Sequence, residues 1–363
     1  MKNQLTFLKI IGVFFCLYLF LVGIGGLSSG IKGLGGGFAK TVLSTTSNPF
    51  TALFIGILCT TLFQSSSTTT SLIVTMASTG ALTIGGAVPM IMGANIGATV
   101  TNTLVSIGYI GKGNEFRRAF AASTVHDFFN IMSVMILFPL ELMFGFLEKL
   151  SLGLGTMLFG VLSTDQAFKS PIKTAVKWGS KKIEYISFDN DIVYIILSVL
   201  LTFLMLFSIV KLLRSLVLEK VEAFFDKYLF RNAISAMIFG IILTIMVQSS
   251  SITTSTIVPL AGAGVLTLRQ IFPFTLGANI GTTVTALVAS LTLNPIAMVA
   301  SFSHLFFNIF GIALIYPIKI LREIPIKLAE SMADQSVNNK FIPLIYLAIL
   351  FIGLPLIIIF MGG

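Results

Sequence analysis

The sequence predicts an all-α polytopic membrane protein made of two inverted-topology repeats, each with a re-entrant helical hairpin and an interrupted transmembrane helix. Its composition is 55% hydrophobic and only 10% charged, whereas soluble domains carry about 25% charged residues. Several continuous apolar stretches reach the roughly 18 residues that can cross a bilayer, which fits helices rather than the alternating strands of a barrel. Finally, residues 64–106 align without gaps to 248–290, with 23 of 43 positions identical.

The charge and cysteine content exclude several function classes. A net charge of +9 would favour nucleic acid as a partner of a soluble protein, but membrane proteins collect Lys and Arg in cytoplasmic loops. We therefore expect a lipid bilayer around the protein and no nucleic-acid partner. The two cysteines, Cys16 and Cys59, lie in apolar runs and form neither a disulfide framework nor a metal-binding spacing. No cofactor is expected, and a homo-oligomer remains open.

The first repeat is expected to span residues 1–145. Its opening apolar run, from Ile10 to Leu27, is longer than the core of a cleaved signal peptide, which predicts a retained helix. The arms at 50–63 and 67–80 flank the polar string QSSSTTTS and are each too short to cross a bilayer, so they predict a re-entrant hairpin. The expected elements are a helix at 7–27, a polar Gly-rich link at 28–48, a hairpin at 50–80, and helices at 85–108 and 116–145.

The second half repeats this order after a mixed polar connector at 146–190. The string QSSSITTS at 248–255 marks its hairpin, and 211–230 has the amphipathic pattern of a helix lying in the membrane interface. The expected elements of the second repeat, 191–320, are a helix at 191–210, a hairpin at 233–266, and helices at 270–292 and 297–318. A C-terminal loop and a last helix, at 341–361, complete the chain over 321–363.

Counting the crossings predicts the inversion. Each unit contributes three full crossings and a hairpin that returns to its starting side, so the second unit enters the membrane from the opposite side to the first. Secondary transporters use this arrangement to build a site at mid-membrane. The larger number of Lys and Arg in the segments that share a side with the N-terminus predicts that this side is cytoplasmic. We therefore expect a multi-pass membrane protein.

The duplicated QSSS strings have the chemistry of an ion-binding site. A helix that starts inside the membrane offers free N–H groups and a positive dipole end to an anion. Tip carbonyls, hydroxyls and amide oxygens suit a hard cation such as sodium. The string GANIG, at 93–97 and 277–281, follows each tip and predicts an unwound or closely packed point in its helix. Neither repeat places a fixed basic residue at these strings, which favours a cation bound together with the anion.

Other readings of these residues stay open at this point. Ser and Thr in membrane helices often bond to their own helix or join two helices, and the glycines of GANIG can serve packing alone. The matched pairs His126/His304 and Asn130/Asn308 can be ligands, gates or packing groups. Asp127 is an acid inside a predicted span, which by default suggests function, but its counterpart is Leu305.

The strings QSSSTTTS, PMIMGANIGATVTNTLVS and EFRRAFAASTVHDFFN, with QSSSITTS, PFTLGANIGTTVTALVAS and SFSHLFFNIFGI, closely resemble the type II sodium-phosphate cotransporters. The resemblance covers about 50–145 and 230–320. It implies a secondary active transporter, not an enzyme, that couples inward sodium movement to uptake of inorganic phosphate by alternating access. The short connector lacks the cysteines and length of the connector in animal members, and it resembles that of a prokaryotic member. The resemblance therefore implies a location in the plasma membrane, here a prokaryotic cytoplasmic membrane.

The resemblance also implies the site residues, with the substrate held between the two QSSS tips at mid-membrane. Which tip residues contact which ion is not fixed by the sequence. As candidates for phosphate we take Ser65, Ser66, Ser67, Thr69, Ser249, Ser250, Ser251 and Thr253; as candidates for sodium we take Gln64, Asn95, Thr99, Gln248, Asn279 and Thr283.

Three alternatives remain at this stage. The first is a sodium-coupled symporter for another small anion such as a dicarboxylate. The second is an intramembrane serine hydrolase that uses Ser65–Ser67 with His126, although two symmetric copies without a G-x-S-x-G context argue against it. The third is a structural or signalling protein, in which matched polar tips have no purpose.

Overall fold

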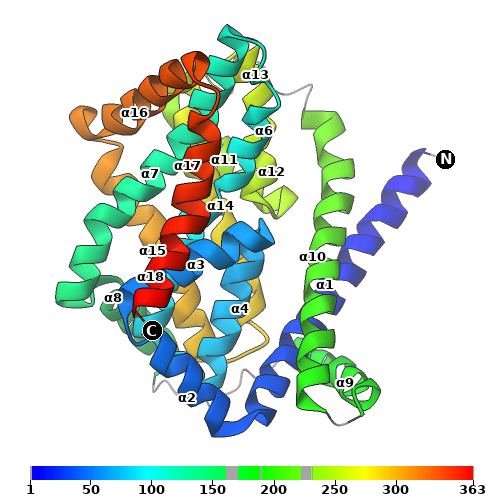
Figure 1. Cartoon of the computed structure of the whole chain (residues 1–363). Coiled ribbons are helices and arrows are strands. Elements are labelled where there is room, and N and C mark those ends of the chain that lie inside the picture. The colour runs from blue at the N-terminus through cyan, green and yellow to red at the C-terminus, as the bar shows by residue number, and fades with distance from the viewer. Residues whose placement is uncertain (1, 161–170, 189, 222–229, 231, 363) are drawn as a thin grey trace.

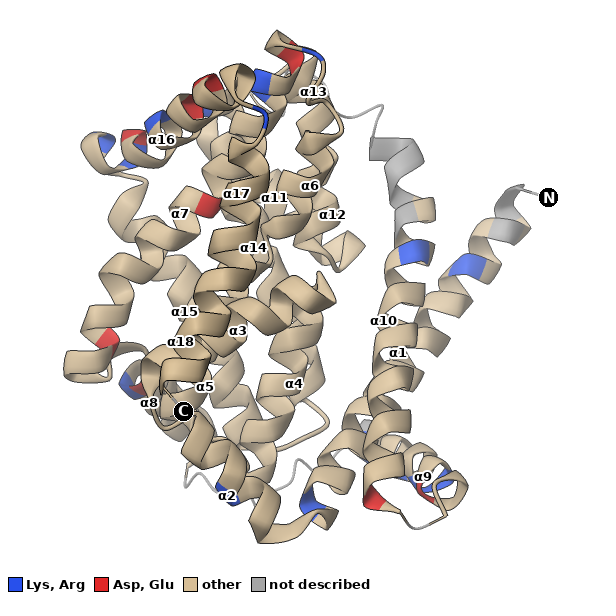
Figure 2. Cartoon of the chain, viewed as in Figure 1, with Lys and Arg blue, Asp and Glu red and all other residues tan. Residues whose placement is uncertain are grey.

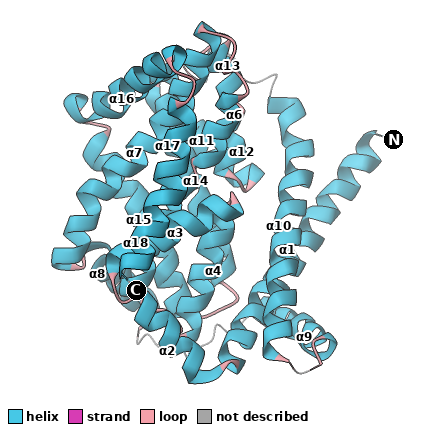
Figure 3. Cartoon of the chain, in the orientation of Figure 1, coloured by secondary structure: helices cyan, strands magenta, loops and turns pink. Residues whose placement is uncertain are grey.

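The computed structural model describes residues 2–160, 171–188, 190–221, 230 and 232–362. Within these ranges the chain is helical and contains no strand (Figure 3). Seven of the described helices are long and apolar enough to cross a membrane, or up to eight if one sharply bent pair forms a single span. The protein is therefore an all-α, multi-pass membrane protein, as its composition predicts. Its division into two repeats and a connector remains a prediction.

The first half contains more helix than the sequence predicts. The segment 28–48, expected as a link, is mostly helical, because the first helix continues to Gly33 and a second follows at once. The second and third helices meet at an angle of 101°, with Asn48 capping the third. The helices of this half are α1 (Lys2–Gly33), α2 (Gly35–Thr45), α3 (Pro49–Phe63), α4 (Ser66–Thr79), α5 (Ile84–Gly97), α6 (Val100–Ile107) and α7 (Asn114–Phe144).

The second half differs from its prediction at one helix and one hairpin arm. The stretch 211–230, expected in the membrane interface, begins as a continuation of a long helix that ends at Val221, and 222–229 lie outside the described residues. The returning hairpin arm is broken before Pro259, whose ring would clash with the carbonyl of Ser255 in a continuous helix. The helices are α8 (Phe146–Phe159), α9 (Pro171–Ile186), α10 (Asp191–Val221), α11 (Ala233–Val247), α12 (Ser250–Ser255), α13 (Val258–Gly262), α14 (Leu268–Ser290) and α15 (Pro295–Ile315).

The prediction of a C-terminal loop after residue 320 is wrong, because the chain there forms the helix α16 (Lys319–Asn338). The low hydropathy of this segment and its internal Pro325 do not suggest a helix from sequence alone. However, its buried residues Ile326, Ala329, Ala333 and Ser336 follow helical spacing. The last span then consists of α17 (Ile342–Ala348), a π-helical turn (Ile349–Gly353) and α18 (Leu354–Gly362).

The two hairpins enter the helix bundle from opposite ends (Figure 1). The pair α3–α4 rises from the end that carries α2, and α11–α12–α13 descends from the end that carries α16, so that both turns lie near mid-height. Helices α1 and α10 run side by side and flank this core, with α9 at their lower end. Figure 2 shows that most charged residues gather at the two ends of the bundle, as expected for a protein whose middle lies in lipid.

Each outgoing hairpin arm packs directly on the helix that carries GANIG. An added Cβ on Gly93 would meet the carbonyl oxygen of Leu53 in α3, and one on Gly277 would meet that of Met237 in α11. The glycines therefore allow backbone-to-backbone contact between α3 and α5, and between α11 and α14. The packing role that the sequence left open for these glycines is the one observed.

Helix α16 connects the two halves at one end of the bundle. Arg117 of α7 forms a two-pronged ion pair with Asp334 of α16. Arg269 of α14 binds Glu323 of α16 at 2.7 Å and approaches Glu330 at 3.9 Å. The hydrogen bond from Arg117 lowers the pKa of Asp334 below its ordinary value. Since both ends of these pairs are partly exposed, they contribute modestly to stability.

Candidate functional site

The two tips have the same local geometry. Gln64 ends α3 in the left-handed region with φ 50°, and Gln248 ends α11 with φ 57°. The next residue in each tip, Ser65 or Ser249, is extended and caps the returning helix. Ser65 Oγ accepts a hydrogen bond from the Thr68 amide at 3.2 Å, and Ser249 Oγ accepts one from the Ile252 amide at 3.3 Å. The chain reverses within two residues in each tip because the cap satisfies the helix start.

Residues from both tips line one cavity of about 390 Å³. The first tip contributes Gln64 and Ser65, and the second contributes Gln248, Ser249 and Ser251. None of the described lining residues is charged.

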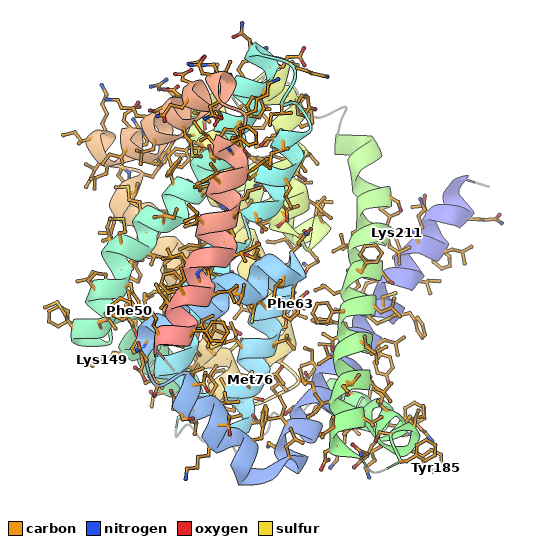
Figure 4. The ribbon with its side chains drawn as sticks, viewed as in Figure 1. Phe50, Phe63, Met76, Lys149, Tyr185 and Lys211 are labelled. Atoms are coloured by element: carbon orange, nitrogen blue, oxygen red, sulfur yellow. The ribbon has the colours of Figure 1, made fainter. Side chains whose placement is uncertain are left out.

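The apolar side of this cavity comes from α10. It consists of Phe203, Leu206, Phe207 and Val210. Phe63, at the end of α3, lies beside α10 (Figure 4), with its ring centroid 5.0 Å from that of Phe203. The cavity thus has polar tips on one side and an aromatic surface on the other, and it is large enough for a small anion with accompanying ions or water.

The second tip is bonded to a break in the first half. The helix expected to be interrupted at GANIG stops after Gly97 and resumes at Val100, whereas its counterpart α14 runs without interruption from Leu268 to Ser290. The break frees the carbonyl of Ala98, which accepts a hydrogen bond from Ser251 Oγ at 3.1 Å. The interruption predicted for both halves is therefore present in one, because only there does a hairpin tip replace the helical hydrogen bond.

A neighbouring contact strengthens this junction. Asn102 Nδ2 of α6 donates to Thr254 Oγ1 of α12 at 2.8 Å. The corresponding residues of the opposite pair are Thr70 and Ala286, and Thr70 bonds back to its own helix, to the Ser66 carbonyl at 2.8 Å. The two halves thus have matching motifs but unequal contacts.

The histidines and the GANIG asparagines pair across the two halves. His126 Nε2 lies 2.6 Å from Asn279 Oδ1, and His304 Nε2 lies 3.4 Å from Asn95 Oδ1. Asn279 Nδ2 donates to Asn130 Oδ1 at 2.8 Å, which fixes the orientation of that amide. Because an amide oxygen only accepts, Nε2 of His126 carries the proton. These buried groups form a polar interface between the first and second halves.

Asp127 is fully buried in α7. Its Oδ2 accepts hydrogen bonds from Tyr346 at 3.0 Å and from Thr103 at 3.2 Å, while its Oδ1 has no hydrogen-bond partner. An ionised carboxylate in a membrane span is unfavourable without a counter-charge. The free oxygen and the neighbouring hydroxyls therefore make this group a candidate ligand for a small cation.

Comparison with known proteins identifies the chain. The model of the Na+/Pi-cotransporter family matches residues 19–164 and 202–358. The chain belongs to the Na+/Pi-cotransporter family.

Individual members of this family align over most of the chain. It is 33% identical to the sodium-dependent phosphate transport protein 2A of Rattus norvegicus, covering 93% of this chain and 65% of that protein. It is also 33% identical to protein 2B of Homo sapiens, covering 94% of this chain and 63% of that protein. The chain thus spans just under two thirds of the length of these relatives. No solved structure matches it significantly.

Within this family framework, the predicted site residues fall into three groups. Gln64, Ser65, Gln248, Ser249 and Ser251 line the cavity. Behind them lie buried tip residues, of which Thr69 bonds back to the Ser65 carbonyl and the Thr253 hydroxyl has no partner; this second group is Ser66, Ser67, Thr69, Ser250 and Thr253.

The third group lies away from the cavity lining. Asn95 and Asn279 belong to the His–Asn interface. Thr99 lies at the helix break, where its hydroxyl donates to the Ile96 carbonyl at 2.7 Å, and Thr283 bonds in the same way to Ile280. No described contact joins these four residues to the cavity, so their role in binding sodium stays a prediction.

The sequence-based prediction did not select Thr101, Phe203 or Tyr346 as site residues. Thr101 lines the cavity with an unpartnered hydroxyl, and its match to Thr285 in the alignment was the available signal. Phe203 and Tyr346 come from α10 and α17, which lie outside the most similar parts of the repeats. No pattern in a single sequence pairs α10 with the tips or α17 with Asp127.

Proposed function

We propose that this protein is a secondary active transporter that couples inward sodium movement to uptake of inorganic phosphate. The observation that carries the proposal is that both QSSS tips line one cavity, with Gln64 and Ser65 on one side and Gln248, Ser249 and Ser251 on the other, and that none of its described lining residues is charged. Membership of the Na+/Pi-cotransporter family supports the identity of both ions. The protein acts in transport and not as an enzyme.

Phosphate binds between the tips, where serine hydroxyls and glutamine amides donate to its oxygens. Because the described cavity lining contains no Lys or Arg, the charge of the anion is balanced by co-bound sodium ions. Glutamine oxygens and tip carbonyls suit sodium, and the free Oδ1 of Asp127 offers a further position for a cation. Phosphate and sodium therefore each raise the affinity of the other by the same factor.

The opposite entry of the two hairpins (Figure 1) supports transport by alternating access. The hairpin α3–α4 opens to the outside and α11–α13 to the cytoplasm, so that motion of each tip exposes the shared cavity to one side. The segments with the larger share of Lys and Arg, including Lys112 and Lys211, then lie in the cytoplasm of the cell whose plasma membrane holds the protein.

Radiolabelled phosphate uptake into proteoliposomes tests the function. We expect accumulation with an inward sodium gradient and none with potassium. Arsenate, which has the tetrahedral shape and charge of phosphate, should compete, whereas succinate should not. Competition by succinate without competition by arsenate would favour the dicarboxylate alternative. Uptake that is independent of sodium would contradict the coupling.

A further inference from the structure

The two tips differ in one matched pair of side chains. In the second tip, Gln248 Oε1 accepts a hydrogen bond from Thr285 Oγ1 at 2.8 Å, and Gln248 Nε2 donates to the Ile245 carbonyl at 2.6 Å. Both ends of the Gln248 amide are thus held. Its side chain is fixed against α14 before any ligand arrives.

The first tip contains the same two residue types but not the same bond. Gln64 and Thr101 occupy the positions that align with Gln248 and Thr285. The Gln64 side chain is exposed and has no hydrogen bond to a described residue, and the Thr101 hydroxyl is buried without a partner. Both residues line the shared cavity.

The backbone of the tip does not cause this difference, because Gln64 and Gln248 have nearly equal φ values of 50° and 57°. The helix behind the tip does differ. Thr285 stands on the uninterrupted α14, whereas Thr101 stands on α6, after the break at 98–99. Ser251, from the second tip, holds that break open by bonding to the Ala98 carbonyl at 3.1 Å.

We propose that Thr101 is a positioning residue for Gln64, and that the Gln64–Thr101 hydrogen bond forms when the first tip closes on its ligand. The proposal rests on the proposed function for the identity of the ligand. In the closed tip the Thr101 hydroxyl donates to Gln64 Oε1, as Thr285 does to Gln248. The Gln64 Nε2 group then faces the cavity in a fixed orientation and donates to a phosphate oxygen. The second tip is the preformed half of the site, and the first is the half that responds to the ligand.

Two features of the structure favour this pairing over a passive Thr101. A buried hydroxyl without a partner is unfavourable, so Thr101 gains from any state that gives it one. Its counterpart Thr285 has such a partner in the other half, Gln248 at 2.8 Å.

Transport kinetics of matched variants test the proposal. The variants are Thr101→Val, Gln64→Met and their combination, with Thr101→Ser as the conservative replacement. Loss of one hydrogen bond should raise the phosphate KM by about fivefold at saturating sodium, with a smaller change in turnover. The double variant should be no worse than the worse single variant, since both remove the same contact. Thr101→Ser should restore the wild-type KM.

Thermal unfolding of the ligand-free purified protein tests whether the glutamine–threonine hydrogen bond is already formed in each tip. Thr285→Val breaks a bond that already exists and should lower the melting temperature. Thr101→Val breaks none and should leave it unchanged or raise it. With saturating sodium and phosphate, Thr101→Val should show a smaller ligand-induced rise in melting temperature than wild type.

The results that overturn the proposal are distinct. Additive effects of Gln64→Met and Thr101→Val on KM, or failure of Thr101→Ser to restore it, would show that Thr101 does not act through Gln64. A ligand-free melting temperature that falls in Thr101→Val as much as in Thr285→Val would show that the first pair is already formed. Absence of phosphate uptake by the wild-type protein would contradict the proposed function instead, and the ligand-free comparison would still decide whether the tips differ.

Discussion

His126 of α7 donates a hydrogen bond of 2.6 Å to Asn279 of α14, so that a histidine of the first half satisfies the GANIG asparagine of the second. The reverse contact, from His304 to Asn95, is longer at 3.4 Å. Both histidines are buried, with relative exposures of 2% and 0%. The two contacts occupy matched positions in one interface. Because their lengths differ, variants that remove each histidine should differ in stability.

Replacing His126 by Leu should destabilise the protein more than replacing His304 by Leu. The first change leaves Asn279 Oδ1 buried and unpaired, which costs about 1–3 kcal/mol, whereas the 3.4 Å contact of His304 is near the limit of a hydrogen bond. The melting temperatures of the two variants in the same detergent measure the difference. Equal losses would contradict the assignment of His126 as the stronger contact.

The close backbone contacts at Gly93 and Gly277 predict that a larger side chain at either position destabilises the fold. Gly93→Ala and Gly277→Ala should each destabilise the fold by roughly 1–3 kcal/mol, because the new Cβ would meet a backbone carbonyl that cannot move aside. Gly153→Ala in α8 is the control, since nothing lies within 4 Å of its added Cβ. That variant should be neutral or stabilising by about 0.5–1 kcal/mol. Thermal unfolding checks both, and a stable Gly93→Ala protein would refute the close packing.

Both capping serines should contribute to phosphate binding during uptake. Ser65→Ala and Ser249→Ala each remove a hydroxyl that lines the cavity and caps a helix, a loss of about 1 kcal/mol or more. We expect each to raise the phosphate KM by roughly fivefold or more, and the double variant to deviate from additivity because one ligand contacts both.

The matched control for this pair is Ser208→Ala on α10. The Ser208 hydroxyl bonds to its own helix, at 2.7 Å from the Leu204 carbonyl, so uptake should not change. If either tip variant transports like wild type, that serine only caps its helix and does not contact the ligand. The proposal of a site shared by both tips would then be wrong.

Cysteine labelling tests the inversion of the hairpins. Gly36→Cys lies in α2, before the first hairpin, and Val265→Cys lies after the second, where the native side chain is 64% exposed. In a background with Cys16 and Cys59 replaced by Ser, an impermeant thiol reagent added to intact cells should label Gly36→Cys and not Val265→Cys. Labelling of both positions from outside would exclude inverted hairpins.

Acid should weaken the α16 ion pair. Arg117 lowers the pKa of Asp334, so the pair contributes stability above the unfolded-state value of about 3.9 and loses it as the pH falls through the lower folded-state value. Asp334→Asn should therefore be less stable than wild type at pH 7, and the two should converge at low pH. Since the side chains are 45% and 53% exposed, the difference is small and should shrink in high salt. A difference that persists at a pH well below the folded-state pKa of Asp334 would point to packing and not charge.

The sequence predicted the parts of the fold that depend on local patterns. Helices α3 and α4, and helices α11 to α13, cover the segments expected as hairpins at 50–80 and 233–266. That these segments are re-entrant in the membrane stays a prediction. The sequence did not predict that GANIG ends a helix in one half and continues it in the other. The same five residues stand in both places, so the difference arises from tertiary contacts of Ser251 and Thr254 with the broken helix.

The site was predicted in part for the same reason. Gln64, Ser65, Gln248 and Ser249 were found from a repeated motif, whereas the aromatic side of the cavity comes from α10, which has no counterpart motif. Likewise, the alignment paired His126 with His304 as equivalents, but it does not reveal that each contacts the asparagine of the opposite half. Contacts between repeats depend on how the two halves dock, and that information is absent from either repeat alone.

The close backbone contacts at Gly93 and Gly277 also limit which helices can move relative to each other. With backbone against backbone at Gly93 and Gly277, no layer of flexible side chains separates α3 from α5 or α11 from α14, so each pair behaves as one stiff lever. The His126–Asn279 contact joins the α11–α14 lever to α7, and the His304–Asn95 contact joins the α3–α5 lever to α15. A displacement of either lever would therefore lengthen the histidine–asparagine hydrogen bond that ties it to a helix of the other half.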